Sequence, residues 1–175
     1  MLRIDKALSA RLAQQMFVDP GDEDFGRCFF NARHALFRLH RLEPSNRPVY
    51  TEGFAVYRHE AAPLPYHRVA AHGWVTQHDQ VIDIDYADCG RYEVTYFPGL
   101  HWPVAAVYQR LKTEPSDHHQ CAVELVPMGL AMTRAYVAAC DYLIATWPEE
   151  VTDPDRQHLD EWRHNLRVLE KTRHG

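Results

Sequence analysis

Apolar side chains recur at helical spacing in the first forty residues. In residues 4–17 they stand four positions apart, which predicts a helix with one apolar face. This apolar stripe consists of Ile4, Leu8, Leu12 and Met16. Asp-Pro-Gly-Asp at 19–22 is a strong turn signal, and a second helix is predicted from about Phe25 to His40, ending before Pro44. Its core stripe consists of Phe29, Ala32, Leu36 and Leu39.

The middle of the chain favours strands, because β-branched and aromatic residues dominate it. Strands are predicted at Val49–Arg58, Val69–Thr76 and Val81–Tyr86. The last two are joined by residues 77–80 and are typical of an antiparallel hairpin. A fourth strand is predicted at Tyr92–Phe97.

Helical patterns return in the rest of the chain. A short helix is predicted at Val104–Leu111, and Met128–Trp147 is compatible with a buried helix. Pro154–Thr172 begins with proline at the first helical position, after Asp153 as the cap. The core stripe of this last helix consists of Leu159, Trp162, Leu166 and Leu169.

The order of these elements predicts an α+β fold, in which N-terminal helices pack on a small antiparallel sheet and the C-terminal third is helical. The length of 175 residues predicts one domain over 1–175. Within it we expect a core at about 22–112 and a helical extension at about 120–172.

Composition narrows the classes of partner. A formal net charge of -5, with no Lys/Arg block longer than two residues, argues against nucleic acid. We find no apolar run long enough for a signal peptide or a membrane span, so we expect a cytoplasmic protein without a membrane partner. The four cysteines have no CxxC spacing, which predicts free thiols and neither metal nor other cofactor.

Cys28 lies near the start of the second predicted helix. The unpaired N–H groups of a helix start lower the pKa of a thiol, and they also stabilise an oxyanion formed when the thiolate attacks a carbonyl. Position alone leaves a second interpretation open, in which Cys28 is a small apolar residue packed in a helix.

The hairpin brings possible partners for a thiol together. If Thr76 pairs with Val81, then His72, Trp74, Asp83 and Asp85 share one face, because side chains alternate along a strand. His72 would then face Asp85 directly and Asp83 diagonally, so that either carboxylate could orient the imidazole.

Five short segments, taken in order, resemble the papain-like and transglutaminase-like superfamily of Cys-His-Asp proteins. These segments are Cys-Phe-Phe-Asn-Ala at 28–32, Tyr-Thr-Glu-Gly-Phe-Ala at 50–55, His-Gly-Trp at 72–74, Val-Ile-Asp at 81–83 and a Tyr-Phe-Pro-Gly turn at 96–99. The resemblance covers about residues 22–100. It implies a papain-like core in which a helix that begins with the cysteine packs on an antiparallel sheet.

The resemblance also implies roles. Cys28 would be the nucleophile, His72 the general base and acid, and Asp83 rather than Asp85 the residue that orients His72. Gly73 departs from the family, where a bulkier residue is common. The side-chain oxyanion donor of many papain-like enzymes has no certain counterpart, although Gln14 or Gln15 could supply it.

Four further residues are candidates for substrate binding or support. Glu52 lies on the apolar face of its strand, so it either ends the sheet at a solvent edge or contacts substrate. Asn31 either places substrate or bonds the backbone. Trp74 shares the face of His72, and Tyr96 either walls a pocket or belongs to the core.

The favoured function is a cysteine-dependent amide-bond enzyme acting through a thioester on Cys28. Peptidase, amidase, deamidase and acyltransferase activities remain open, on a peptide, protein or small amide. The alternative is a non-catalytic binding or interaction protein on the same scaffold, and the C-terminal helices could bind a protein partner or a second copy. A metal-dependent hydrolase using His72, Asp83 and Asp85, with Asp88 or His101, is the weakest interpretation.

Overall fold

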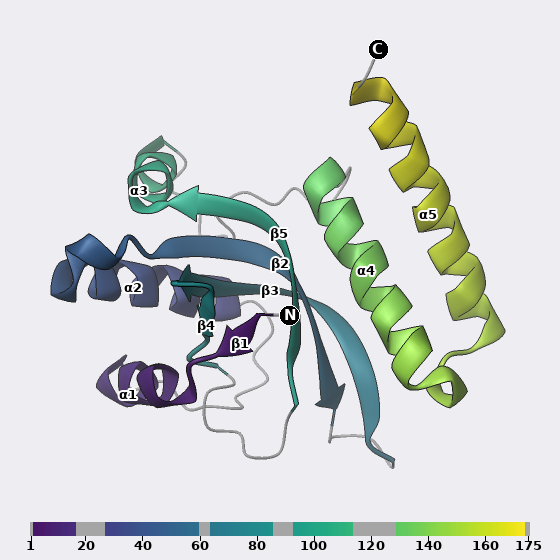
Figure 1. The fold of residues 1–175 in the computed structure, drawn as a ribbon, viewed down its shortest axis with the longest axis horizontal. Coiled ribbons are helices and arrows are strands. Elements are labelled where there is room, and N and C mark those ends of the chain that lie inside the picture. The colour runs from purple at the N-terminus through teal and green to yellow at the C-terminus, as the bar shows by residue number, and fades with distance from the viewer. Residues whose placement is uncertain (1, 17–26, 60–63, 86–92, 114–128, 174–175) are drawn as a thin grey trace. The chain divides into compact units, whose positions relative to one another are not determined.

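The computed structural model describes residues 2–16, 27–59, 64–85, 93–113 and 129–173. These residues form five α-helices and a five-stranded mixed sheet of order β1-β4-β3-β2-β5 (Figure 1). The helices are α1 (Lys6–Met16), α2 (Arg27–Leu42), α3 (Val104–Thr113), α4 (Leu130–Thr146) and α5 (Asp153–Arg173). The strands are β1 (Arg3–Ile4), β2 (Val49–His59), β3 (Tyr66–Gln77), β4 (Gln80–Ile82) and β5 (Thr95–Pro103). The predicted α+β class with a helical C-terminal third is confirmed.

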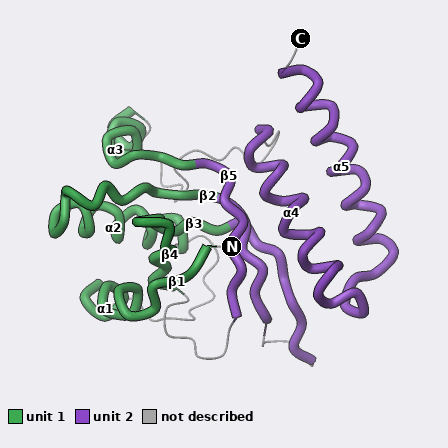
Figure 2. Tube along the Cα trace, viewed as in Figure 1, with its two compact units in different colours: residues 1–52, 72–92, 101–123 green, residues 53–71, 93–100, 124–175 purple. Residues whose placement is uncertain are grey.

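The chain divides into two compact units (Figure 2). Unit 1 consists of residues 1–52, 72–92 and 101–123, and unit 2 consists of residues 53–71, 93–100 and 124–175. Unit 1 contains α1, α2, α3, β1 and β4, whereas unit 2 contains α4 and α5. That the whole chain folds as one domain stays a prediction.

The first strand was not predicted. Arg3 and Ile4 pair in parallel with Gln80 and Val81. The sheet is therefore mixed, whereas a purely antiparallel sheet was expected. The prediction that the first helix begins at Ile4 is therefore wrong. Helix α1 begins after Asp5, whose Oδ1 accepts the backbone N–H of Leu8 at 2.9 Å and so satisfies one of the free donors of the first turn.

The hairpin has the expected register but a shorter second strand. Thr76 pairs with Val81, and the two turn residues His78 and Asp79 have φ values of 49° and 60°. Two positive φ values are typical of the type I′ turn that joins two-residue hairpins. The prediction that the second strand continues to Tyr86 is wrong, because β4 ends at Ile82.

Strand β5 corrects the expectation for residues 92–99. The Tyr-Phe-Pro-Gly segment at 96–99 was predicted as a turn, yet it lies within β5. The strand order places β5 at an edge of the sheet, where a proline that lacks an N–H donor is tolerated.

Helices α1 and α2 both contribute buried apolar residues to the core of unit 1. The predicted stripe of α2 is buried, at Phe29, Ala32, Leu36 and Leu39. Leu12 and Ala13 of α1 are also buried.

The core of unit 2 has its own apolar residues. Met132, Ala135 and Ala139 of α4 are buried, as is Leu159 of α5. Trp162, Leu166 and Leu169 are only half-buried, so Leu159 is the one residue of the predicted α5 stripe that is fully buried.

Thr152 rather than Asp153 caps α5, because Thr152 and Asp155 exchange hydrogen bonds as a capping box. Among the described helices, none has the length and apolar character required to cross a membrane.

Several expectations concern residues outside those that the structure describes. They are the turn at 19–22, the helix start at Phe25, Tyr86, Asp88, Tyr92 and the range 120–128.

Candidate functional site

Cys28 lies in the first turn of α2 and is a free, partly exposed thiol. The first turn is the part of a helix whose N–H groups have no partner within the helix. The partial exposure of Cys28 is also relevant, because a substrate must be able to reach any nucleophile. Cys28 is thus a partly exposed thiol at the N-terminal end of α2 as the structure describes it, and an effect of that end on its reactivity stays a prediction.

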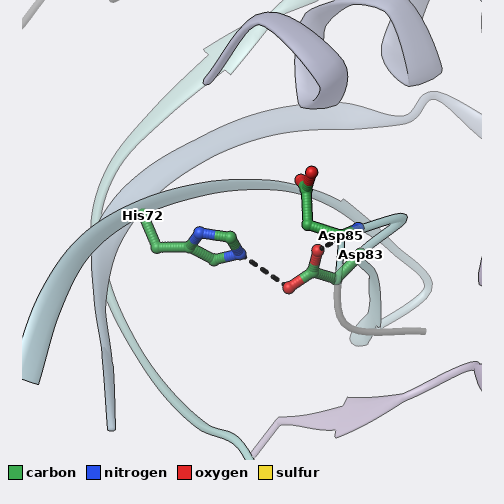
Figure 3. A group of neighbouring side chains, drawn as sticks. All are labelled: His72, Asp83 and Asp85. Atoms are coloured by element: carbon green, nitrogen blue, oxygen red, sulfur yellow. Dashed lines mark hydrogen bonds and ion pairs between the residues drawn. The ribbon is translucent and has the colours of Figure 1, made fainter. Parts of the chain in front are cut away.

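His72 lies on β3 and is 2% exposed. Its Nε2–H donates to Oδ2 of Asp83 at 2.7 Å (Figure 3). The ring is stacked near Trp74, with a centroid separation of 6.0 Å and an interplanar angle of 24°. The imidazole is thus bonded to a buried carboxylate and has an aromatic ring as a neighbour.

The charge of His72 is set by two opposing effects. Burial favours the neutral ring and lowers its pKa, but the Asp83 carboxylate and the Cys28 sulfur favour the charged ring, each through its charge and a hydrogen bond. The pKa of His72 lies well above its usual value as a result. Because Asp83 occupies Nε2, Nδ1 is the ring atom that remains for the Cys28 sulfur.

Asp83 is held in place from three directions. It is 1% exposed, and its backbone N–H donates to Oγ of Ser9 at 3.0 Å. Its Oδ1 accepts the backbone N–H of Asp85 at 3.0 Å, which leaves Oδ2 for His72. A side chain that accepts the N–H two residues ahead forms an Asx turn, which explains why β4 ends before Asp83.

Asp83 is the carboxylate that accepts the hydrogen bond from His72, while its role as the residue that orients a catalytic base stays a prediction. Figure 3 draws no bond from the Asp85 carboxylate to the imidazole, although one of its oxygens lies within 4.8 Å of a ring nitrogen. Oδ1 of Asp85 accepts a hydrogen bond from Nδ2 of Asn31 at 2.6 Å. Asn31 is 8% exposed and lies on α2. It therefore contacts the turn that carries Asp83, a role that neither of the two sequence interpretations included.

Gly73 allows α2 to approach β3 closely. A Cβ atom at Gly73 would lie 2.9 Å from Cδ1 and 3.2 Å from Cα of Phe29, and 3.2 Å from the Tyr50 hydroxyl. Phe29 follows Cys28 and Gly73 follows His72, so this contact joins the sequence neighbours of Cys28 and His72. A side chain larger than that of glycine at position 73 would therefore be disfavoured for a steric reason.

Glu52 is fully buried within unit 1. It is 0% exposed, and its Oε1 accepts the Tyr50 hydroxyl at 2.8 Å. The interpretation that Glu52 ends the sheet at a solvent edge is therefore wrong. Its contact with substrate stays a prediction.

The remaining candidates lie elsewhere. Tyr96 is 4% exposed and belongs to unit 2, so it is core, as one of its two interpretations held. Oε1 of Gln15 accepts Nε–H of Arg38 at 3.0 Å, and Arg38 lies ten residues beyond Cys28 on α2, about 15 Å along the axis. Gln15 is thus not placed beside Cys28, and Gln14 is exposed.

Ser9 is the supporting residue that sequence reasoning missed. It is 0% exposed and lies three and four residues before Leu12 and Ala13, the other buried residues of α1. A polar residue on the buried face of a helix needs a hydrogen-bond partner. The spacing could have indicated that Ser9 has one, but not that the partner is Asp83.

His72, Asp83 and Asp85 could also hold a metal ion, since one ligand atom from each lies within 4.8 Å of the others. In this structure the same groups are engaged with protein partners, through the His72–Asp83 bond, the Asp85 N–H and the Asn31 amide.

Comparison of the chain with protein-family models, with curated proteins and with solved structures finds no match. The function must therefore be argued from the site itself.

Proposed function

We propose that this chain is a cysteine-dependent amide-bond enzyme that forms a thioester on Cys28. The observation that supports it most is the environment of His72, which binds Asp83 through one nitrogen and interacts with Cys28. Nucleophile, base and orienting carboxylate in contact are the arrangement that activates a thiol.

The reaction begins from a Cys28 thiolate beside a His72 imidazolium. The sulfur attacks the carbonyl carbon of the amide, and the oxyanion is stabilised by N–H groups at the start of α2. The C–N bond then breaks as His72 gives its proton to the leaving amine. The product is a thioester on Cys28 and a neutral imidazole.

The second half-reaction releases the acyl group. His72 takes a proton from water or from an amine, which attacks the thioester and restores the thiolate and the imidazolium. Water gives hydrolysis, as in a peptidase, amidase or deamidase, whereas an amine gives acyl transfer. Asp83 holds the ring in one orientation throughout and remains ionised. A peptide, protein or small amide in the cytoplasm is the substrate that fits this chemistry.

The pH dependence of alkylation tests the thiolate–imidazolium pair without a known substrate. We expect iodoacetamide to modify Cys28 nearly as fast at pH 6 as at pH 8.5, because the pKa of His72 lies well above its usual value and an imidazolium beside the sulfur favours the thiolate. Peptide mapping by mass spectrometry assigns the modification to each cysteine.

Cys140 is the internal control for this measurement. It is a free, partly buried thiol of α4, and burial raises its pKa to about 11. Its alkylation should fall on the order of 300-fold from pH 8.5 to pH 6, in step with its thiolate fraction. In the His72→Gln variant, the alkylation rate of Cys28 should fall from pH 8.5 to pH 6 about as steeply as that of Cys140. A steep fall at Cys28 in the unaltered chain would contradict the proposal and favour a non-catalytic binding protein.

The metal cluster supports a second candidate, a metal-dependent hydrolase that uses His72, Asp83 and Asp85. Oxygen and imidazole ligands suit zinc, manganese and related ions. Elemental analysis of the purified protein separates the two functions. One equivalent of metal, together with chelator-sensitive activity that survives Cys28→Ser, would favour the hydrolase over the thiol enzyme.

A further inference from the structure

The contacts around the candidate site form a closed ring that includes Asn31 and Asp85. Asn31 donates to Asp85, the Asp85 backbone N–H donates to Asp83, and Asp83 accepts from His72. His72 in turn interacts with Cys28, which lies on the same helix as Asn31. Each side of the ring is a hydrogen bond or a short stretch of chain.

The part of this ring of contacts that runs along α2 is short and rigid. Cys28 and Asn31 are three residues apart on α2, so their side chains emerge on the same face, about 4.5 Å apart along the axis. A displacement of Asn31 relative to Asp85 would therefore displace Cys28 relative to His72 by a similar amount. The Asn31–Asp85 contact is the one side-chain hydrogen bond in the ring that joins α2 to the turn after β4.

We propose that Asn31 and Asp85 are positioning residues that set the separation between the Cys28 sulfur and the His72 ring; this inference rests on the proposed function. The bond is 2.6 Å long and partly buried, and an ionised acceptor makes it stronger than a neutral hydrogen bond. Their proposed effect is exerted through Cys28 and Asp83 and not through contact with substrate. Because a misplacement of about 1 Å can cost about a hundredfold in rate, the loss of this bond should be visible in the reactivity of Cys28.

Reciprocal exchange of the two side chains tests the proposal. Asn31→Asp places two carboxylates opposite each other, and their repulsion should break the contact between α2 and the turn after β4. Asp85→Asn leaves an amide oxygen that can still accept from Asn31, so its effect should be smaller. The double variant N31D/D85N restores an amide–carboxylate bond with donor and acceptor reversed.

The readout is the ratio of Cys28 alkylation rates at pH 6 and pH 8.5, with thermal unfolding as a check on folding. We expect Asn31→Asp to lower this ratio at least tenfold, and the double variant to recover most of it. Cys140, in unit 2, should keep its ratio in all variants. Such recovery separates positioning from a general loss of structure, because a merely destabilised fold would not regain its pH profile.

An unchanged ratio in folded Asn31→Asp would overturn the positioning role, as would a double variant no better than the single one. Failure of the proposed function would give a different result. In that case Cys28 of the unaltered chain would already be unreactive at pH 6, independently of any substitution at Asn31 or Asp85.

Discussion

At the scale of single residues, the proposed pair of Cys28 and His72 is supported by neighbours that have no role in the proposed reaction. Gly73 lets the backbone of α2 lie against β3, and Ser9 accepts the backbone N–H of Asp83. Both keep buried groups where Cys28 and His72 need them. The site is therefore sensitive to substitutions that leave Cys28, His72 and Asp83 intact.

Gly73→Ala should impair both stability and reactivity. The added Cβ would come within 2.9 Å of the Phe29 ring and 3.2 Å of its Cα, so α2 must shift. We expect a loss of about 1–3 kcal/mol in the free energy of unfolding, typical of overpacking, and a lower ratio of Cys28 alkylation at pH 6 to that at pH 8.5. Urea denaturation and the alkylation assay measure the two effects.

Gly129→Ala is the matched control for the alkylation assay, because a Cβ there would meet no atom within 4 Å. It should leave the Cys28 profile unchanged. If Gly73→Ala also left the profile unchanged, close packing of α2 on β3 would not be what places Cys28.

The residues of the site differ in how far the sequence reveals them. Cys28, His72 and Asp83 could be predicted because their types and the parity of the hairpin carry a chemical meaning. Ser9 was not predicted, and Asn31 was a candidate whose partner was not. The partners of these two residues lie 74 and 54 positions away, and no periodicity encodes such pairings. Glu52 was placed on the correct strand, but its burial depends on the three-dimensional packing around β2.

At the scale of elements, the spacing of apolar residues predicted most helices and the hairpin register. It did not predict the short strand β1. Strand β1 has two residues, too few to show a period, and it forms by pairing with β4. Strand β4 ended earlier than its apolar pattern indicated, since the side chain of Asp83 competes for the backbone N–H of Asp85. Strand β5 includes Pro98 and Gly99, which usually mark a turn.

The pair formed by His72 of β3 and Asp83 after β4 should make stability depend on pH. The pKa of His72 is raised in the folded chain, so its contribution is fully present below about pH 6.5 and is lost as pH rises through the folded value. We expect the free energy of unfolding to fall as the pH rises above about 6.5. Asp83→Asn removes the charge that raises this pKa and should flatten the fall.

Urea denaturation of both chains at several pH values measures this difference. Parallel curves for the unaltered chain and Asp83→Asn would show that the ionic contact between His72 and Asp83 does not stabilise the fold.

At the scale of the whole molecule, the candidate site lies entirely within unit 1. Cys28, His72 and Asp83 belong to it, as do Asn31, Asp85 and Ser9. The C-terminal helices α4 and α5 belong to unit 2, and their use as a surface for a protein partner or a second copy stays a prediction. Unit 1 is thus the part of the chain to which the proposed chemistry is assigned.

The most direct test of this chemistry is to trap the thioester. An activated ester such as p-nitrophenyl acetate transfers its acetyl group to a nucleophilic thiolate and releases nitrophenolate. We predict a rapid burst of nitrophenolate at pH 6 with the acetyl group on Cys28, removable by neutral hydroxylamine, and loss of the burst in Cys28→Ser and His72→Gln. Acetylation spread over other residues, or a burst that persists in His72→Gln, would contradict the proposed activation of Cys28 by His72.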